Sequence, residues 1–481
     1  MSKIALLQPN ADECYGHRQG YASSIRPPET GLAVLSSYIT TKAPSHEVVC
    51  LDPNRTDREI AREASTCDVF GLTDWFSNHK RVIDIAEKTK KLNDRTVIVV
   101  GGPNVPGLAS LLLQKYPFVD YAVERDGEDT FLGLANGVSI KQLPNLWYRD
   151  NGVQFTKPGF TNLKELPLWN FDCFQALEDR LSEYQQAIAI KGSQDFDPWL
   201  VPPVTMFSFR GCMKAVKQGV CSYCTSAETR GRALPPDKFW QQIALLENRY
   251  GASVLYEADD IFPVSVQRME QIAQAKPSQV KTPSIRAYAY MPDFIELDES
   301  KIKRMIAALK TIGVFNLFFG VESYGIEQIT KANKVAVSIE DSDRVIRQLG
   351  EAGIKTTMAY LLGLPGETQQ SLQKNINSLE ILLGGGFVER VYLSIVMALR
   401  GTPLFEQISR HPRINAEYLE QTGKDLATDD YPDYSQLQRL SVRHLTGIAP
   451  IEINDWLSRM IITCERSLPA HRVGGFLLKS I

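Results

Sequence analysis

The sequence has no long hydrophobic run and no block of charge of one sign. Its longest apolar stretch, near residues 391–399, falls well short of the roughly 20 residues that a membrane-spanning helix needs, and the apolar part of residues 1–9 is far shorter than the core of a signal peptide. Lys and Arg total 53 against 56 Asp and Glu, a formal net charge of −3. We therefore expect a cytoplasmic protein with no nucleic-acid partner and no membrane partner.

Internal repeats and low-complexity tracts are also missing, and 481 residues are too many for one hydrophobic core, so two or three domains are expected. The eight cysteines are not spaced like a disulfide framework. Three of them are clustered, which in a reducing compartment indicates a metal or iron–sulfur site. The other five lie alone and, apart from the last, are interpreted as core residues: Cys14, Cys50, Cys67, Cys173 and Cys464.

The first 140 residues alternate short β-rich apolar segments with amphipathic helical patterns. Strands are predicted at residues 3–9, 46–52, 68–73, 96–101 and 120–123. Five strands separated by helices are typical of a doubly wound parallel sheet, which binds ligands at the carboxyl ends of its strands. We therefore expect a Rossmann-like domain over residues 1–140, with its functional residues in the loops after the strands.

Residues 141–203 lose this periodicity and accumulate Pro, Trp, Asn and Gly, so they are interpreted as an extended linker. A second α/β alternation follows, with strand patterns at residues 204–209, 253–258, 284–289, 314–321, 355–362 and 390–398. Six βα units indicate a partial (β/α)6 barrel over residues 204–404, whose chemistry also gathers at the strand C-termini. The fold class is thus α/β, and residues 405–481 form a mostly helical C-terminal region.

The clustered cysteines follow the first strand of this second unit. Cys212, Cys221 and Cys224 have the spacing Cys-x8-Cys-x2-Cys. Three thiolates are too few for a closed structural zinc site, which takes four ligands, but they can hold three irons of a [4Fe–4S] cluster and leave the fourth iron open. Spacing alone also permits a zinc loop completed by a distant His or Cys, and with it a non-enzymatic, zinc-stapled binding module.

These cysteines, with Tyr223 between the last two, resemble the signature of the radical SAM superfamily. The first interval is five residues longer than in the commonest family form, as in branches with longer loops. Three more motifs follow in the family's order: a GxES segment at 320–323, a GLPGET turn at 363–368, and at 400–404 a PGTPL-like segment with Arg in place of Pro.

The resemblance implies a [4Fe–4S] cluster with S-adenosylmethionine (SAM) on its open iron. Asp259 and Asp260 end the second strand, where the family binds the SAM amino group, although an Asp pair is also a common strand-end cap. Arg286 could pair with the SAM carboxylate or be a salt-bridge partner. The full set of SAM contacts that the resemblance implies is Tyr223, Asp259, Asp260, Arg286, Glu322, Ser323, Gly363 and Pro365.

Superfamily members with a doubly wound domain before the barrel often bind cobalamin, and the resemblance runs from residue 1 to about residue 404. The DxHxxG motif, whose His coordinates cobalt in other cobalamin proteins, is absent. Trp75 is therefore our candidate to cover the lower face of the corrin, with packing between domains as the alternative. The resemblance places the cobalamin site at Thr73, Asp74, Trp75, Gly101, Gly102, Asn104 and Glu124.

The function implied is a cobalamin-dependent radical SAM methyltransferase. It would use a 5′-deoxyadenosyl radical and methylcobalamin to methylate an unactivated carbon of a peptide or natural-product intermediate, with electrons from an external flavodoxin-type or ferredoxin-type donor. The main alternative is a peptide epimerase or another maturase whose cobalamin-type domain is vestigial. Cys464 would then donate hydrogen, although a lone Cys is more often a small buried hydrophobe.

Overall fold

The computed structural model describes residues 1–11, 29–182, 204–225, 228–252, 254–257 and 259–476, so Cys14 lies outside the described residues. The described residues form two compact units, one up to Thr205 and one from Met206 onward. None of the helices in these ranges is both long enough and apolar enough to span a membrane.

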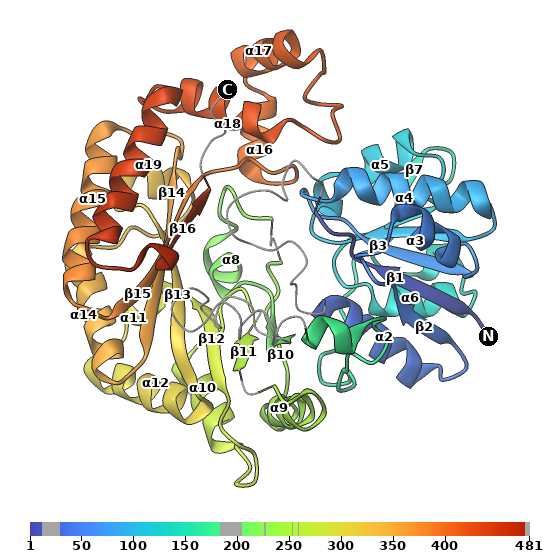
Figure 1. The fold of residues 1–481 in the computed structure, drawn as a ribbon, viewed down its shortest axis with the longest axis horizontal. Coiled ribbons are helices and arrows are strands. Elements are labelled where there is room, and N and C mark those ends of the chain that lie inside the picture. The colour runs from blue at the N-terminus through green and yellow to red at the C-terminus, as the bar shows by residue number, and fades with distance from the viewer. Residues whose placement is uncertain (12–28, 183–203, 226–227, 253, 258, 477–481) are drawn as a thin grey trace. The chain divides into compact units, whose positions relative to one another are not determined.

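The first unit is built on a seven-stranded sheet in the order β2-β1-β3-β4-β5-β6-β7 (Figure 1). Its first five strands are parallel, which confirms the predicted doubly wound sheet. Their apolar runs, such as IALL and VIVV, are continuous because both faces of the sheet are covered. The strands are β1 (Lys3–Leu7), β2 (Glu47–Cys50), β3 (Val69–Thr73), β4 (Val97–Gly101), β5 (Tyr121–Val123), β6 (Leu146–Arg149) and β7 (Val153–Phe155).

Helices cover both faces of this sheet. Helices α3, α4 and α5 pack on one face, where Ile60, Ile85 and Leu112 share a buried cluster with strand residues. Helix α2 packs against α6, and a Cβ on Gly71 of β3 would lie 2.8 Å from the Phe131 ring of α6. The helices are α2 (Thr30–Lys42), α3 (Asp57–Ala64), α4 (His79–Leu92), α5 (Ala109–Lys115) and α6 (Glu128–Ala135), with short 3-10 helices at Val105–Gly107 and Ile140–Gln142.

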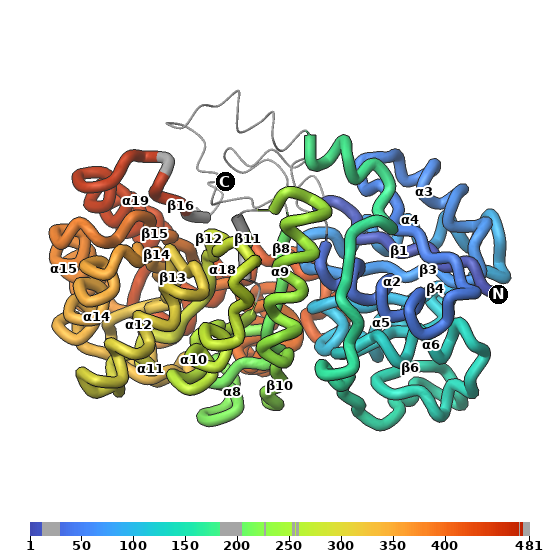
Figure 2. Tube along the Cα trace, turned by 90° about the horizontal axis from the view of Figure 1, so that it is seen from below, coloured from blue at the N-terminus to red at the C-terminus, as the bar shows by residue number. Residues whose placement is uncertain are grey.

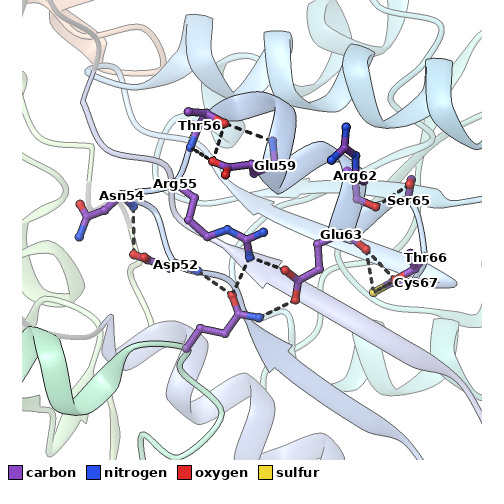
Figure 3. Close-up of polar contacts among 11 residues, drawn as sticks. Asp52, Asn54, Arg55, Thr56, Glu59, Arg62, Glu63, Ser65, Thr66 and Cys67 are labelled. Carbon is purple, nitrogen blue, oxygen red and sulfur yellow. Dashed lines mark hydrogen bonds and ion pairs between the residues drawn. The ribbon is translucent and has the colours of Figure 1, made fainter.

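Helix α3 shows how side chains define the local structure of this unit (Figure 3). Thr56 and Glu59 form a capping box, in which each side chain accepts a hydrogen bond from the other residue's backbone N–H. Arg55, just before the helix, forms an ion pair with Glu63. Gln175 donates from Nε2 to Glu63 Oε1 at 2.5 Å, so a segment far along the chain is attached to the same helix.

The segment expected to be a linker is partly folded into the first unit, which corrects that interpretation. Strands β6 and β7 form a hairpin through Asn151 and Gly152, both with positive φ, and β6 pairs antiparallel with β5. Asn-Gly is a strong hairpin signal, which the sequence analysis missed. Phe174 then bridges to Cys50 at the edge of the sheet. Residues 183–203 of the expected linker lie outside the described residues.

The second unit contains a seven-stranded sheet in the order β8-β11-β12-β13-β14-β15-β16, and the strand pairs from β11 to β16 are parallel. The six predicted barrel strands are present. Strand β16 is an addition from the region expected to be helical. The strands are β8 (Thr205–Met206), β11 (Val254–Glu257), β12 (Ser284–Ala289), β13 (Val314–Glu322), β14 (Lys355–Leu362), β15 (Val388–Ile395) and β16 (Val473–Phe476).

Helices follow these strands and lie in an arc outside them (Figure 1), and Figure 2 shows the same elements from below. Those of the barrel are α9 (Pro236–Tyr250), α10 (Val266–Gln274), α11 (Met291–Ile295), α12 (Glu299–Ile312), α13 (Ile326–Lys331), α14 (Ile339–Glu351) and α15 (Gln369–Gly384). The C-terminal region is otherwise helical, as expected. It comprises α16 (Pro403–Ser409), α17 (Pro412–Thr422), α18 (Tyr434–Leu445) and α19 (Pro450–Glu465), with a 3-10 helix at Ala470–Arg472.

Candidate active site

The cysteine loop begins where the first barrel strand is interrupted. The predicted strand 204–209 is split into β8 and a second short strand, β9 (Phe209–Arg210), which pairs antiparallel with β10 (Arg232–Ala233). Gly211 follows with φ +98°, and a Cβ there would lie 2.5 Å from the carbonyl oxygen of Arg230. The two-stranded ribbon therefore closes the base of the loop that carries the three cysteines.

The longer interval between the first two cysteines contains a short helix, α8 (Met213–Gln218). The buried ammonium of Lys214 donates to the carbonyl oxygen of Gly219 at 2.8 Å and to that of Asn333. The Asn333 side chain donates in return to the carbonyl oxygens of Gln218 (3.2 Å) and Val220 (2.7 Å). The longer spacing is thus absorbed by a folded insertion that is fastened to the end of α13.

Backbone bonds to the ends of two helices, α13 and α16, hold the second half of the loop. Ser222 N donates to Ala332 O at 3.0 Å, and Leu404 N donates to Ser222 O at 2.7 Å. The RGTPL segment therefore contacts the cysteine loop directly. Arg400, which replaces the family's Pro, is itself buried and donates to the carbonyl oxygens of Leu426 and Asp429 at 2.7 and 2.6 Å.

Cys212, Cys221 and Cys224 are half-buried, and no described cysteine forms a disulfide. Among the described residues, no three His, Cys, Asp or Glu side chains are gathered closely enough to enclose a metal ion. Cys212 and Cys221 nevertheless interact electrostatically. Three half-buried thiols on one anchored loop suit a cluster that keeps one iron open, because soft thiolate ligands favour iron–sulfur binding.

Glu322 is held close to this loop by two side chains. It is buried with φ +65°, at a register shift between β13 and β14, and its Oε1 lies 3.0 Å from Lys334 Nζ. Lys334 also donates to Gly320 O at 2.7 Å. A Cβ on Gly320 would lie 2.5 Å from Glu322 Oε1, which explains the glycine of the GxES segment. Tyr223 forms a hydrogen bond with Glu322. The pKa of Tyr223 is raised, mainly by burial and secondly by the negative charge of Glu322.

Lys334 is a site residue that the sequence analysis missed. Burial disfavours its charged form, but Glu322 and Cys221 outweigh that effect and raise the pKa of Lys334. Its ammonium also lies 5.7 Å from the centre of the Tyr290 ring. In the sequence, Lys334 is recognisable only as a cation shortly after α13, twelve residues beyond Glu322. The irregular register of β13 at Glu322 brings the two side chains together.

The two Asp residues after β11 are in different environments. Asp259 is 1% exposed, and its carboxylate accepts from Ser208 N (2.9 Å), Ser208 Oγ (2.6 Å) and Phe209 N (2.7 Å). It therefore anchors the start of the cysteine loop. Asp260 is exposed. The pKa of Cys212 is raised mainly by the burial of Cys212, and the negative charge of Asp260 raises it further. Asp260 is consequently the exposed member of the pair, and it lies near Cys212.

Arg286 lies in the middle of β12 among aromatic rings. Its guanidinium is 5.5 Å from the centre of the Phe318 ring and 6.0 Å from that of Tyr392. Tyr288 packs edge-on against Phe318 at 4.8 Å. Arg286 is buried and the three rings are half-buried. They alternate along their strands with fully buried side chains such as Phe319, so they share one face of the sheet. A contact between Arg286 and SAM stays a prediction.

Ser323 and the GLPGET turn are packed into the protein. Asn375 of α15 accepts from Tyr324 N at 2.8 Å and donates to Ser323 Oγ at 3.2 Å. Gly363 has φ +79°, and a Cβ there would lie 3.1 Å from Val442 of α18. Pro365 is buried. These three residues therefore shape the strand ends, and their contact with SAM stays a prediction.

Glu367 is a fully buried carboxyl group within the same turn. Its oxygens accept from Gly363 N (3.0 Å) and Ser371 Oγ (2.6 Å), and burial raises its pKa to about 7. Thr368, as its place in the motif predicts, caps α15 by accepting from Ser371 N at 3.2 Å.

In the first unit, Asp74 joins the loops after β3 and β4. It is fully buried and receives bonds from His79 Nδ1 at 2.8 Å and Asn104 Nδ2 at 3.3 Å, while its N–H donates to Gly101 O at 2.7 Å. Gly102 has φ +108°, and a Cβ there would lie 2.6 Å from Asp74 O. Gly102 is thus required for packing between these loops.

The Trp75 side chain is 40% exposed at this edge of the sheet, because hydrogen bonds hold the residues around it in place. The backbone N–H of Trp75 donates to Asn78 Oδ1 at 2.8 Å. Asn78 Nδ2 donates to Pro9 O, in the loop after β1, at 2.9 Å. Thr73 is half-buried at the end of β3, and Glu124 accepts from Trp147 Nε1 at 3.0 Å. A pinned loop with an exposed indole suits a flat ligand such as a corrin.

Two family models match this chain. Residues 26–135 match the B12 binding domain, and residues 206–379 match the Radical SAM superfamily. The chain therefore contains a B12 binding domain followed by a Radical SAM domain. The second match includes all three clustered cysteines and the GxES and GLPGET motifs.

Two relatives are similar to this chain over a longer range. An uncharacterized methyltransferase of Pyrococcus horikoshii is 22% identical over 84% of this chain and 82% of its own length. The anaerobic magnesium-protoporphyrin IX monomethyl ester cyclase of Cereibacter sphaeroides is 20% identical over 61% of this chain and 46% of its own length.

Two solved structures share the fold. The radical SAM methyltransferase TsrM from Kitasatospora setae, with cobalamin and a [4Fe–4S] cluster bound, has a TM-score of 0.62 at 17% identity, over 85% of this chain and 78% of that one. The cobalamin-dependent SAM radical enzyme OxsB, with aqua-cobalamin and SAM bound, has a TM-score of 0.65 at 16% identity, over 97% of this chain and 61% of that one. They confirm the predicted fold class.

Replacing Lys214 by Met should weaken the cluster loop of the radical SAM domain. Two backbone carbonyl groups would lose their charged donor, at a cost of about 1–3 kcal/mol, so we expect iron and sulfide to be lost about tenfold faster after anaerobic reconstitution. Lys217→Met on the same helix is the matched control. The Lys217 side chain is 50% exposed, and its ion pair with Asp293 is long, at 3.5 Å. Equal rates of loss in both variants would contradict the anchoring role.

Glu367→Gln should flatten the pH dependence of stability. Because the folded-state pKa is raised from 4.5 to about 7, the buried carboxyl group favours folding below pH 4.5 and this contribution is lost as pH rises through 7. The difference amounts to about 3 kcal/mol in the free energy of unfolding. Denaturation from pH 5 to 9 should show this decline in the wild type and not in the variant; parallel curves would refute it.

Gly102→Ala in the B12-binding domain should lower the free energy of unfolding by about 2–4 kcal/mol, because the new Cβ combines a strained backbone with a clash against Asp74. Gly137→Ala is the control, since Gly137 also has a positive φ, +69°, but nothing lies within 4 Å. We expect it to cost about 1 kcal/mol. Urea denaturation of the full chain, followed by fluorescence, would compare them, and equal losses would show that packing at Gly102 is unimportant.

Proposed function

We propose that this chain is a cobalamin-dependent radical SAM methyltransferase that methylates an unactivated carbon of a small molecule or peptide. The observation that carries the proposal is that one chain combines three half-buried thiols at the head of a parallel sheet with a B12-binding domain. Support comes from the Pyrococcus relative, described as a methyltransferase, and from TsrM and OxsB, whose structures contain cobalamin.

When bound, the cluster and SAM supply a radical that removes hydrogen from carbon, and cobalamin supplies the methyl group. The chain's own residues hold and orient these groups. Cys212, Cys221 and Cys224 would be the iron ligands, on a loop whose position is set by Lys214 and by the backbone of Ser222. Electrons would come from an external donor of the flavodoxin or ferredoxin type.

For SAM, we assign the direct contacts to the residues beside the cysteine loop. Tyr223 and Glu322 interact with each other, and Asp260 lies near Cys212. Lys334 neutralises the charge of Glu322 and fixes the orientation of its carboxylate. Arg286 is a further candidate. The buried residues Asp259, Ser323, Gly363 and Pro365 would act by positioning the strand ends.

For cobalamin, the loops after β3 and β4 are the binding edge. Trp75 would cover the lower face of the corrin, because the only histidine nearby in sequence, His79, is 1% exposed and bonded to Asp74. Thr73, Gly101 and Glu124 would border the site. Asp74, Gly102 and Asn104 would hold the two loops together.

The epimerase alternative receives no support from Cys464. That thiol is fully buried in α19, and burial raises its pKa to about 12. Its surroundings are those of a small apolar side chain. A zinc-stapled binding module is also a poor explanation, because the Radical SAM match spans the cysteine loop.

The test is product analysis of the full chain after anaerobic reconstitution with iron, sulfide and cobalamin. With SAM and a reductant, we expect 5′-deoxyadenosine, and with substrate also S-adenosylhomocysteine. Cys221→Ser should lower 5′-deoxyadenosine at least 100-fold, because one cluster ligand is lost, while the absorbance of bound cobalamin should remain.

Cys464→Ala serves as the control and should form both products at the wild-type level. If a true substrate is consumed without S-adenosylhomocysteine, methyl transfer is ruled out. Deuterium uptake from heavy water into product, abolished in Cys464→Ala, would establish the epimerase instead. Stoichiometric zinc without sulfide in anaerobically purified protein would overturn both enzymatic readings.

A further inference from the structure

Two cysteines that lie far apart in the sequence meet in the first unit. The Sγ atoms of Cys50 and Cys173 are 3.2 Å apart, although 123 residues separate them along the chain. The sequence alone predicts two isolated core residues at these positions. Cys50 is the last residue of β2, at the edge of the sheet, and Cys173 lies in the segment that follows the β6–β7 hairpin.

The backbone holds this pair in place. Cys50 N donates to Cys173 O at 2.7 Å, and Gln175 N donates to Cys50 O at 2.9 Å, so the segment runs beside β2 like a further short strand. Trp169 and Phe171 anchor the segment because their side chains are fully buried. With the backbones already joined, a side-chain movement of about 1 Å brings the sulfur atoms to the roughly 2.05 Å of a disulfide bond.

The two thiols differ in the way that thiol–disulfide exchange requires. Cys50 is fully buried, and burial raises its pKa, whereas the hydrogen bond from Cys50 lowers the pKa of Cys173, with a smaller effect of Ser36. Cys173 is also partly exposed. The nearby charges are Glu29, Arg180 and Asp172. Cys173 is thus suited to attack first and Cys50 to resolve.

We propose that Cys50 and Cys173 are a redox modification site, at which a low-molecular-weight disulfide such as oxidised glutathione converts the two thiols into an intramolecular disulfide. The Cys173 thiolate attacks one sulfur of the small disulfide and releases one thiol. Cys50 then loses its proton to solvent and attacks Cys173 Sγ, releasing the second. The protein gives up two electrons and two protons, and the small disulfide becomes two thiols.

The disulfide would fasten the segment around Phe174 to the edge of the sheet. This edge strand ends on the same side as β3 and β4, because the strands are parallel, and the loops after β3 and β4 carry Trp75 and Gly102. Closing a loop of this length restricts the unfolded chain strongly, so oxidation should stabilise the first unit. The inference depends on the first unit alone and not on the proposed function.

The experiment uses the full chain with its cluster assembled, so that the cluster cysteines are occupied. After anaerobic incubation with oxidised glutathione, remaining thiols are alkylated and peptides are analysed by mass spectrometry. We expect a crosslinked peptide pair containing Cys50 and Cys173 that dithiothreitol separates. We also expect the melting temperature of the first unit, followed in the full chain, to rise by roughly 5–10 °C on oxidation.

Cys67→Ala is the matched control, because Cys67 is also a buried, isolated cysteine of this unit, and it should keep the crosslink and the shift. Cys173→Ser should lose both. In the reduced wild type, iodoacetamide should modify Cys173 at least tenfold faster than Cys67, a measurement that needs no variant. A stable mixed disulfide on Cys173 with Cys50 still reduced, or a crosslink that forms only in denaturant, would overturn the proposal.

Discussion

The position of the cysteine loop depends on hydrogen bonds from residues that are distant in sequence. Asp259 holds its first turn, Lys214 and Asn333 hold the inserted helix, and backbone bonds to Ser222 hold its second half. Between Cys212 and Cys224, the regular structure is the short helix α8. The positions of the three thiols therefore depend on contacts with segments that lie outside the loop.

The same principle governs the first unit. Asp74, itself fully buried, satisfies donors from His79 and Asn104 and so joins the loops after two strands. A buried carboxylate is tolerable only when it is fully hydrogen-bonded, and this requirement makes the loop geometry specific. Trp75 is exposed at the edge as a consequence of that rigidity.

Much of the architecture could be predicted from the sequence. Alternation of β-rich and helical patterns indicated both parallel sheets, and the three-cysteine loop with its GxES and GLPGET segments indicated the superfamily. The hairpin at Asn151 and Gly152 was missed because its strands are short and lie in a stretch rich in turn residues. Strand β16 was missed because its VGGF sequence carries a weak strand signal and follows four helices.

The composition of the site divides in a similar way. The sequence by itself determined the three candidate cluster ligands, because iron–sulfur chemistry demands thiols at a suitable spacing. Whether a carboxylate contacts a ligand or supports a strand depends on what surrounds it. Asp259 and Asp260 are adjacent, yet one is buried under the cysteine loop and the other is exposed. The pairings of Lys334 with Glu322 and of Cys50 with Cys173 were likewise decided only by tertiary structure, because parallel strands and long connections bring together residues that have no relationship along the chain.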